Sequence, residues 1–83
     1  LAEIDDCIAR DPADLAARYQ RAAVRLAADD YAGAMDDLLY IARTDRGYRN
    51  DIGRTSLLAL FDLLGGTHPL TRQFRQALSE SLH

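Results

Sequence analysis

The sequence is poor in cysteine and lacks long apolar runs. Cys7 is the only cysteine among the 83 residues, so no internal disulfide and no Cys-x-x-Cys redox pair can form. Its place beside an apolar stripe, with no basic neighbour, predicts a buried or half-buried structural thiol. A chain without disulfides fits a reducing compartment, and we expect a cytoplasmic location. No apolar run approaches the ~20 residues of a membrane span, so we expect no membrane partner.

Lysine is absent and histidine is rare. All ten basic residues are arginine, and thirteen acids outnumber them, so the net charge of −3 leaves no electrostatic footprint for nucleic acid. His68 and His83 have no second ligand one helical turn away, and no nucleophile and acid that would complete a triad. Gly65-Gly66 ends a helix rather than preceding one, unlike a phosphate-binding loop. We therefore expect no enzyme, and no catalytic, cofactor-binding or metal site.

Paired aspartates are frequent. They stand at Asp5-Asp6, Asp29-Asp30 and Asp36-Asp37. Neighbouring residues on a helix point about 100° apart, so such pairs do not converge on a metal ion. We expect them to serve solubility and the capping of turns.

Apolar residues recur with helical spacing throughout, which predicts an all-α fold of about five antiparallel helices. The expected helices are a first one that stops at Asp11-Pro12, a second up to the Asp29-Asp30 turn, a third from Tyr31 that ends before a polar loop over 44–50, a fourth between Asn50 and Gly65, and a fifth from Pro69 onward. Asp11 and Pro12 are the expected cap and first turn of the second helix, and Asn50 the expected cap of the fourth. Gly47 is the expected stop of the third helix.

The chain also repeats itself. A shift of about 34 residues places Leu1 on Met35 and Ile4 on Leu38, and this is the period of tetratricopeptide repeats. We predict a single tetratricopeptide-like domain over 1–83. Its parts are 1–12 (second half of a preceding repeat), 13–45 (one repeat) and 50–83 (a terminal helical pair). Because the chain starts in helical phase at Leu1, we expect a C-terminal fragment of a longer protein.

One helix fits this frame poorly. On the strict period, the aromatic and leucine positions of the second helix fall on Arg18 and Arg21. Only a slip of one residue puts Tyr19, Ala22 and Leu26 into the core. The helix is therefore either shifted or unusually exposed to solvent.

The stretch TSLLALFDLLGG, residues 55–66, is apolar almost all round, with Asp62 as its only charge. A helix without a polar face is buried on both flanks. We expect it to lie between the second and third helices on one side and the fifth on the other. If it is only half covered, the spare apolar face is a surface for a partner or a second copy.

Two features of the sequence suggest partner binding. Arg18, Arg21 and Arg25 share one helix face, either as a stripe for a partner's carboxylates or as a solvated face with weak Asp14–Arg18 and Arg25–Asp29 pairs. Tyr48 lies in a polar loop and is either packed back onto the helices or offered to a partner.

Several segments together resemble one family. They are DPADLAARYQ, YAGAMDDLLYIARTDRGYRND, SLLALFDLLG and HPLTRQFRQAL. The chain resembles the C-terminal helical domain of the YbbN-type thioredoxin-like co-chaperones, or chaperedoxins.

The resemblance implies a bacterial, cytoplasmic protein-interaction module with a thioredoxin-like domain upstream. Such a module would hold unfolded client proteins and dock to chaperonin through residues 70–83, with Arg72, Phe74, Arg75 and Leu82 as contacts. The alternative is a homodimerisation domain without direct chaperone contact.

Overall fold

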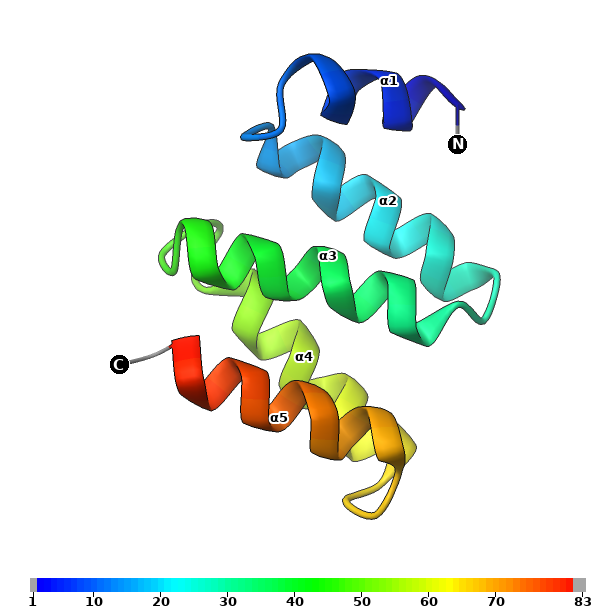
Figure 1. Cartoon of the computed structure of the whole chain (residues 1–83), viewed down its shortest axis with the longest axis vertical. Helices are drawn as coiled ribbons and strands as arrows, with labels where there is room; N and C mark the ends of the chain where they lie inside the picture. The colour runs from blue at the N-terminus through cyan, green and yellow to red at the C-terminus, as the bar shows by residue number, and fades with distance from the viewer. Residues whose placement is uncertain (1, 82–83) are drawn as a thin grey trace.

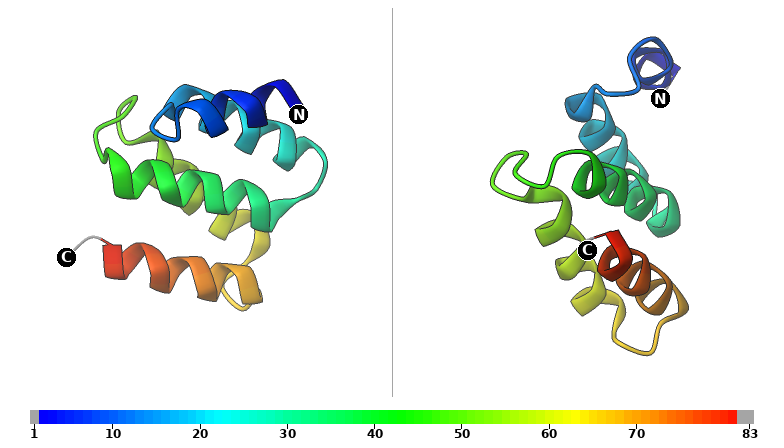
Figure 2. Two further views of the ribbon diagram at one scale, coloured as in Figure 1. Left: turned by 45° about the horizontal axis from the view of Figure 1, so that its top comes forward. Right: turned by 60° about the vertical axis from the view of Figure 1, so that its left-hand side comes forward.

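The computed structural model describes residues 2–81 and consists there of five helices joined by short connections (Figure 1). They are α1 (Ala2–Arg10), α2 (Leu15–Ala27), α3 (Tyr31–Thr44), α4 (Ile52–Leu64) and α5 (Pro69–Ser81). Successive helices from α2 to α5 reverse direction, and α1 and α5 lie at the two ends of the array (Figure 2). The expected all-α antiparallel array is confirmed. Leu1, Leu82 and His83 lie outside the described residues.

Aspartates set the starts of α2 and α3. The side chain of Asp14 accepts a hydrogen bond from the Ala17 N–H, and that of Asp30 accepts one from the Gly33 N–H. Each bond satisfies one of the free N–H groups of a helix start. The expected cap of α2 was wrong, because Asp11 instead accepts from the Ala13 N–H in the preceding turn.

The connection between α3 and α4 differs from the expectation. Helix α3 ends at Thr44 with Asp45 extended, before Gly47 is reached. Arg49, Asn50 and Asp51 then adopt φ angles of 47°, 58° and 65°, a left-handed run that reverses the chain. The N-cap of α4 is therefore Asp51 rather than Asn50, and its carboxylate accepts from Arg54 Nε at 3.0 Å.

The apolar core is centred on α3, which packs against α2 on one side and against α4 and α5 on the other. Its buried residues are Ala22, Ala34, Met35, Leu38, Leu39, Ala42, Leu57, Leu60, Phe61, Phe74 and Leu78. Gly53 marks the closest approach of α3 and α4. A Cβ atom there would lie 2.9 Å from Ala42 N and from Leu38 O, so no larger residue fits without moving a helix.

Two expectations about burial were wrong. Helix α4 contacts α3 and α5 but is not packed against α2, so it has one buried face and one open face. Leu58 and Leu63 are 40% and 67% exposed, although Leu57 between α3 and α5 is fully buried. Cys7 is exposed on α1 rather than buried. The spacing of apolar residues shows how much of a helix surface is apolar, but it does not show which part of that surface packs against another helix.

Two adjacent leucines test this half-covered state of α4. We expect Leu57→Ala to lower the free energy of unfolding by about 2–5 kcal/mol, because it leaves a cavity in the core. Leu58→Ala should cost less than about 1 kcal/mol, because that side chain keeps much of its contact with water. Urea unfolding followed by circular dichroism measures both. Equal, large losses would show that Leu58 is covered after all.

Candidate functional site

A buried carboxylate joins α2 to α3. Asp37 is fully buried, and Arg21 holds it with two hydrogen bonds, Nε to Oδ2 at 3.0 Å and Nη2 to Oδ1 at 2.7 Å. This two-point contact is the strongest geometry that arginine and a carboxylate form. Hydrogen bonds to Asp37, and then to Asp5, raise the pKa of Arg21 above its ordinary value against the opposing effect of burial.

Two further arginines of α2 surround the same carboxylate. Arg25 Nη1 lies 3.3 Å from Asp37 Oδ2 and also donates to the Gly33 carbonyl at 3.2 Å. Arg18 Nη1 lies 3.6 Å from Asp37 Oδ1, and its guanidinium stacks 3.7 Å above the ring of Tyr40. We call Arg18, Arg21, Arg25 and Asp37 the arginine cluster.

The arginine cluster extends to α1. Arg21 Nη1 donates to Asp5 Oδ1 at 2.9 Å, so one side chain bridges α1 and α3. The solvated-face interpretation was wrong, and so was the solubility role for Asp37, because these groups pair with one another across three helices. The pairs Asp14–Arg18 and Arg25–Asp29 are not among the ion pairs of residues 2–81. A direct role of the three arginines in partner binding stays a prediction.

A groove runs between α2 and α4, above α3. Its volume is about 300 Å³, and its lining is almost entirely apolar. The lining residues are Tyr19, Ala22, Ala23, Leu26, Ala34, Leu38, Ser56, Ala59, Leu60 and Leu63. On α2, alanines occupy the middle of the wall and Tyr19 and Leu26 its ends, whereas on α4 the small residues Ser56 and Ala59 precede Leu60 and Leu63.

The groove could not be read directly from the sequence. Of the residues that the shifted repeat frame placed in the core, Ala22 is buried there and Tyr19 packs against it, whereas Leu26 is 36% exposed, and all three line the groove. Leu63, on the opposite wall, is the most exposed large apolar residue at 67%. One feature of the sequence could have indicated the groove. The lining residues have the same spacing on both helices, at positions 19, 22, 23 and 26 and at positions 56, 59, 60 and 63.

The loop before α4 reaches Tyr19, one of the residues that line the groove. The Arg49 guanidinium lies 5.7 Å from the ring centre of Tyr19 and 5.4 Å from that of Tyr48, within the range of cation–π attraction. Tyr48 is half-buried in this stack. Whether it also contacts a partner stays a prediction.

The expected contacts on α5 fall into two groups. Phe74 is 3% exposed and belongs to the core, so its ring is not at the surface and the expectation of a direct partner contact was wrong. Arg72 and Arg75 are exposed, and Arg75 lies 5.7 Å above the ring of Phe61. Leu82 belongs to the part that the structure does not describe.

Residues 2–81 contain no cluster of three or more histidine, cysteine or acidic side chains placed to hold a metal ion. Within the same range, every helix is too short or too polar to cross a bilayer.

A family model described as "Tetratricopeptide repeat" matches residues 1–83, which is the whole chain. Comparison with curated proteins and with solved structures gave no match.

Neighbouring aspartates provide a test of the arginine cluster. Asp37→Asn removes the buried negative charge and leaves three guanidinium groups crowded together. We expect a loss of about 3 kcal/mol in unfolding free energy, at the low end for a broken buried pair because the arginines keep some contact with water. Asp36→Asn, on the exposed side of α3, should change stability by less than about 0.5 kcal/mol. Similar small losses in thermal or urea unfolding would rule out a structural role for the cluster.

Proposed function

Since the chain belongs to the tetratricopeptide repeat family, we propose that it is a protein-interaction module that binds a partner in the α2–α4 groove. The observation that carries this proposal is the pair of apolar stripes on α2 and α4, which no described element covers. Apolar surface that stays open in a small domain marks an interaction site more often than not.

The groove suits apolar side chains of a partner. Burial of one leucine-sized side chain contributes roughly 1.5–3 kcal/mol, so two or three such contacts contribute roughly 3–9 kcal/mol before the cost of association and give weak, transient binding. Only Ser56 and Tyr19 have polar side-chain groups in the lining, so the groove offers few hydrogen-bonding groups that could distinguish one polar sequence from another. Non-native segments of many proteins would satisfy it.

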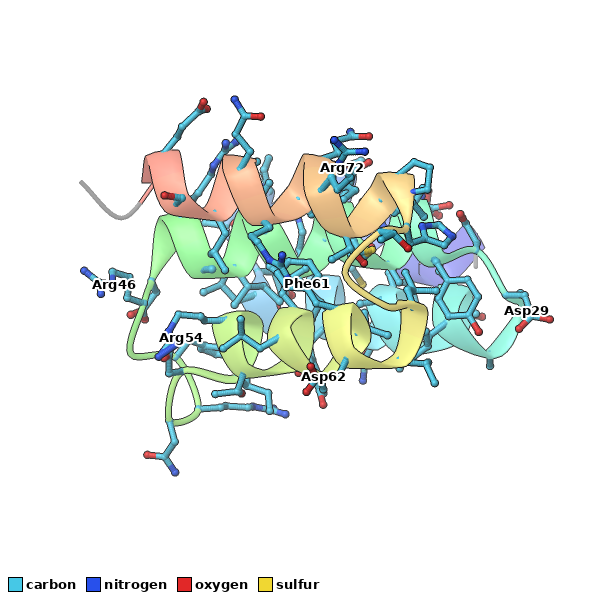
Figure 3. All side chains as sticks on the ribbon, turned by 90° about the horizontal axis from the view of Figure 1, so that it is seen from below. Asp29, Arg46, Arg54, Phe61, Asp62 and Arg72 are labelled. Carbon is cyan, nitrogen blue, oxygen red and sulfur yellow. The ribbon has the colours of Figure 1, made fainter. Side chains whose placement is uncertain are left out.

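We further propose that this binding serves a co-chaperone. The resemblance to the YbbN-type family supports a cytoplasmic protein with a thioredoxin-like domain upstream, which holds unfolded clients and passes them to chaperonin. In this proposal the exposed Arg72 and Arg75 of α5 form the chaperonin contact. Helix α5 contributes no residue to the groove lining, and Figure 3 shows Arg72 on it.

A homodimer is the second candidate. It is favoured by the exposure of two large apolar side chains on α4, Leu58 and Leu63, which are 40% and 67% exposed. Two copies that pair through this helix would bury both leucines, and a twofold dimer is the commonest outcome for such a patch.

The groove proposal predicts different effects for two exposed leucines of α4. Leu63 lines the groove and Leu58 does not. We expect Leu63→Ser to weaken binding to reduced, carboxymethylated α-lactalbumin, a permanently unfolded protein, by about tenfold, because it removes one apolar contact. Leu58→Ser should leave that affinity within about twofold. Both variants should keep the helical circular dichroism spectrum.

Sedimentation of the same variants separates the two candidates. A monomer at all concentrations, with the affinity order above, supports the groove. A dimer that both substitutions dissociate equally, together with no binding to the unfolded protein, would favour the homodimer and overturn the groove.

The chaperonin contact has its own test. Reversal of both charges in Arg72→Glu/Arg75→Glu should weaken binding to chaperonin by about tenfold and leave binding to carboxymethylated α-lactalbumin unchanged. Surface plasmon resonance with immobilised chaperonin measures the first quantity. Undiminished binding of the double variant would place any chaperonin contact elsewhere.

A further inference from the structure

Arg18 is the least satisfied member of the arginine cluster. Asp37 accepts hydrogen bonds from Arg21 at 2.7 and 3.0 Å and from Arg25 at 3.3 Å. Arg18 Nη1 lies 3.6 Å from Asp37 Oδ1, which is beyond hydrogen-bond distance. An arginine side chain has five N–H donors. Within residues 2–81, none of the five donors of Arg18 forms a hydrogen bond.

The terminal nitrogens of Arg18 remain accessible although most of the side chain is covered. The side chain is 17% exposed. Its Nε is sealed from solvent without a hydrogen-bond acceptor, whereas Nη1 and Nη2 are not sealed. A buried donor without an acceptor costs free energy and is rare in folded proteins. The edge formed by Nη1 and Nη2 is therefore where an acceptor from outside the chain can reach this guanidinium.

The ring of Tyr40 fixes the plane of the same guanidinium. Arg18 Cζ lies 3.7 Å from the centre of the ring, so the two groups are stacked. Stacking covers a face of the guanidinium, while its N–H donors lie in the plane and point outward. The stack consequently blocks none of the donors and reduces the rotamer freedom that would be lost on binding. This arrangement is prepared for a two-point contact with an oxyanion.

The carboxylates near Arg18 have other partners. Asp14, one turn before it on the same helix, accepts from the Ala17 N–H and caps α2. Asp5 pairs with Arg21 on the α1 side of the cluster. Apart from the 3.6 Å contact with Asp37, no ion pair within the described residues involves Arg18. The open edge is thus not satisfied from within residues 2–81.

We propose that Arg18 binds a carboxylate of a partner protein through its Nη1–Nη2 edge. The aspartate or glutamate side chain of the partner accepts two parallel N–H···O bonds in the plane of the guanidinium. Arg18 contacts Asp37 and Tyr40 of α3 and does not line the groove. The site is therefore separate from the groove and does not depend on its proposed function.

The charge balance favours a ligand with a single negative charge. The three arginines of the cluster are matched by Asp37, by Asp5 at 2.9 Å and, more distantly, by Asp30 at 3.9 Å. Asp36 is exposed one turn before Tyr40 on α3. A network so close to neutrality, in a chain of net charge −3, disfavours a dianion such as phosphate more than a monoanion. A carboxylate has one charge and fits the two-donor edge.

A titration followed by NMR of the arginine Nε–H groups tests the site. The probes are the acetylated and amidated tripeptide Ala-Glu-Ala, its neutral Ala-Gln-Ala counterpart and inorganic phosphate at matched ionic strength. The Arg18 signal is identified by its loss in Arg18→Lys. We expect the glutamate peptide to half-saturate the shift of Arg18 at a concentration about tenfold lower than that of Arg46, an exposed arginine without an ion pair. The glutamine peptide should shift neither signal.

Two pairs of variants separate the guanidinium fork and the stack from charge alone. Arg18→Lys keeps the charge but loses the fork, so the glutamate peptide should no longer shift the Tyr40 ring signals, whereas Arg46→Lys should leave that shift unchanged. Tyr40→Leu removes the stack and should weaken the binding at Arg18 about fivefold, whereas Tyr40→Phe should keep it within about twofold. Circular dichroism checks that each variant is folded, and the titration of the unmodified chain decides the matter if one is not.

The possible results are distinct. Equal half-saturation at Arg18 and Arg46, or unchanged binding in Arg18→Lys, would overturn the site. Tighter binding of phosphate than of the glutamate peptide would overturn the assignment to a carboxylate. None of these results bears on the groove, which is tested separately by Leu63→Ser and the unfolded protein.

Discussion

The contact between Asp37 and the arginines of α2 determines how the rest of the array is arranged. A carboxylate held at two points by Arg21, at 2.7 and 3.0 Å, fixes α2 in rotation about its own axis as well as in position. On α2, three residues that line the groove, Tyr19, Ala22 and Leu26, directly follow the three arginines of the cluster in the sequence. A step of one residue turns a helix by about 100°. While the arginines face α1 and α3, the apolar stripe must therefore face the groove.

The arginine cluster and the apolar core have different roles in the fold. Buried ion pairs contribute little net stability compared with apolar packing of the same volume, because desolvation of the charges offsets their attraction. The stability of the domain comes mainly from the apolar core around α3, where Met35 and Leu57 are fully buried. The arginine cluster contributes direction, because its hydrogen bonds form in only one register. Helix α2 is thus aligned on α3 by hydrogen bonds as well as by packing, whereas α4 and α5 are aligned by packing.

The number and order of the helices could be predicted from the helical spacing of apolar residues, although the ends of α2, α3 and α4 lie at other residues than expected. The contacts of α4 could not. Its sequence is apolar all round, and only the position of α2 on the far side of α3 shows that one face stays open. The arginine cluster could not be predicted from pairs within one helix, because Arg21 and Asp37 are 16 residues apart on different helices. The strict repeat frame contains an indication of it, because it places arginines at positions where a helix normally packs, and a buried arginine needs an acid opposite. The groove depends on how α2 and α4 are placed in space, and the spacing of residues does not determine that.

The close crossing at Gly53 has a mechanical consequence. With the backbones of α3 and α4 in contact, α4 cannot move towards α3, and the left-handed run at 49–51 holds the start of α4 in place. One wall of the groove, α4, is thereby held close against α3. A rigid, preformed surface requires no rearrangement during encounter, so partners of different affinity would associate at similar rates. Their differences would lie in the lifetime of the complex, and the domain would discriminate among partners by how long it retains them.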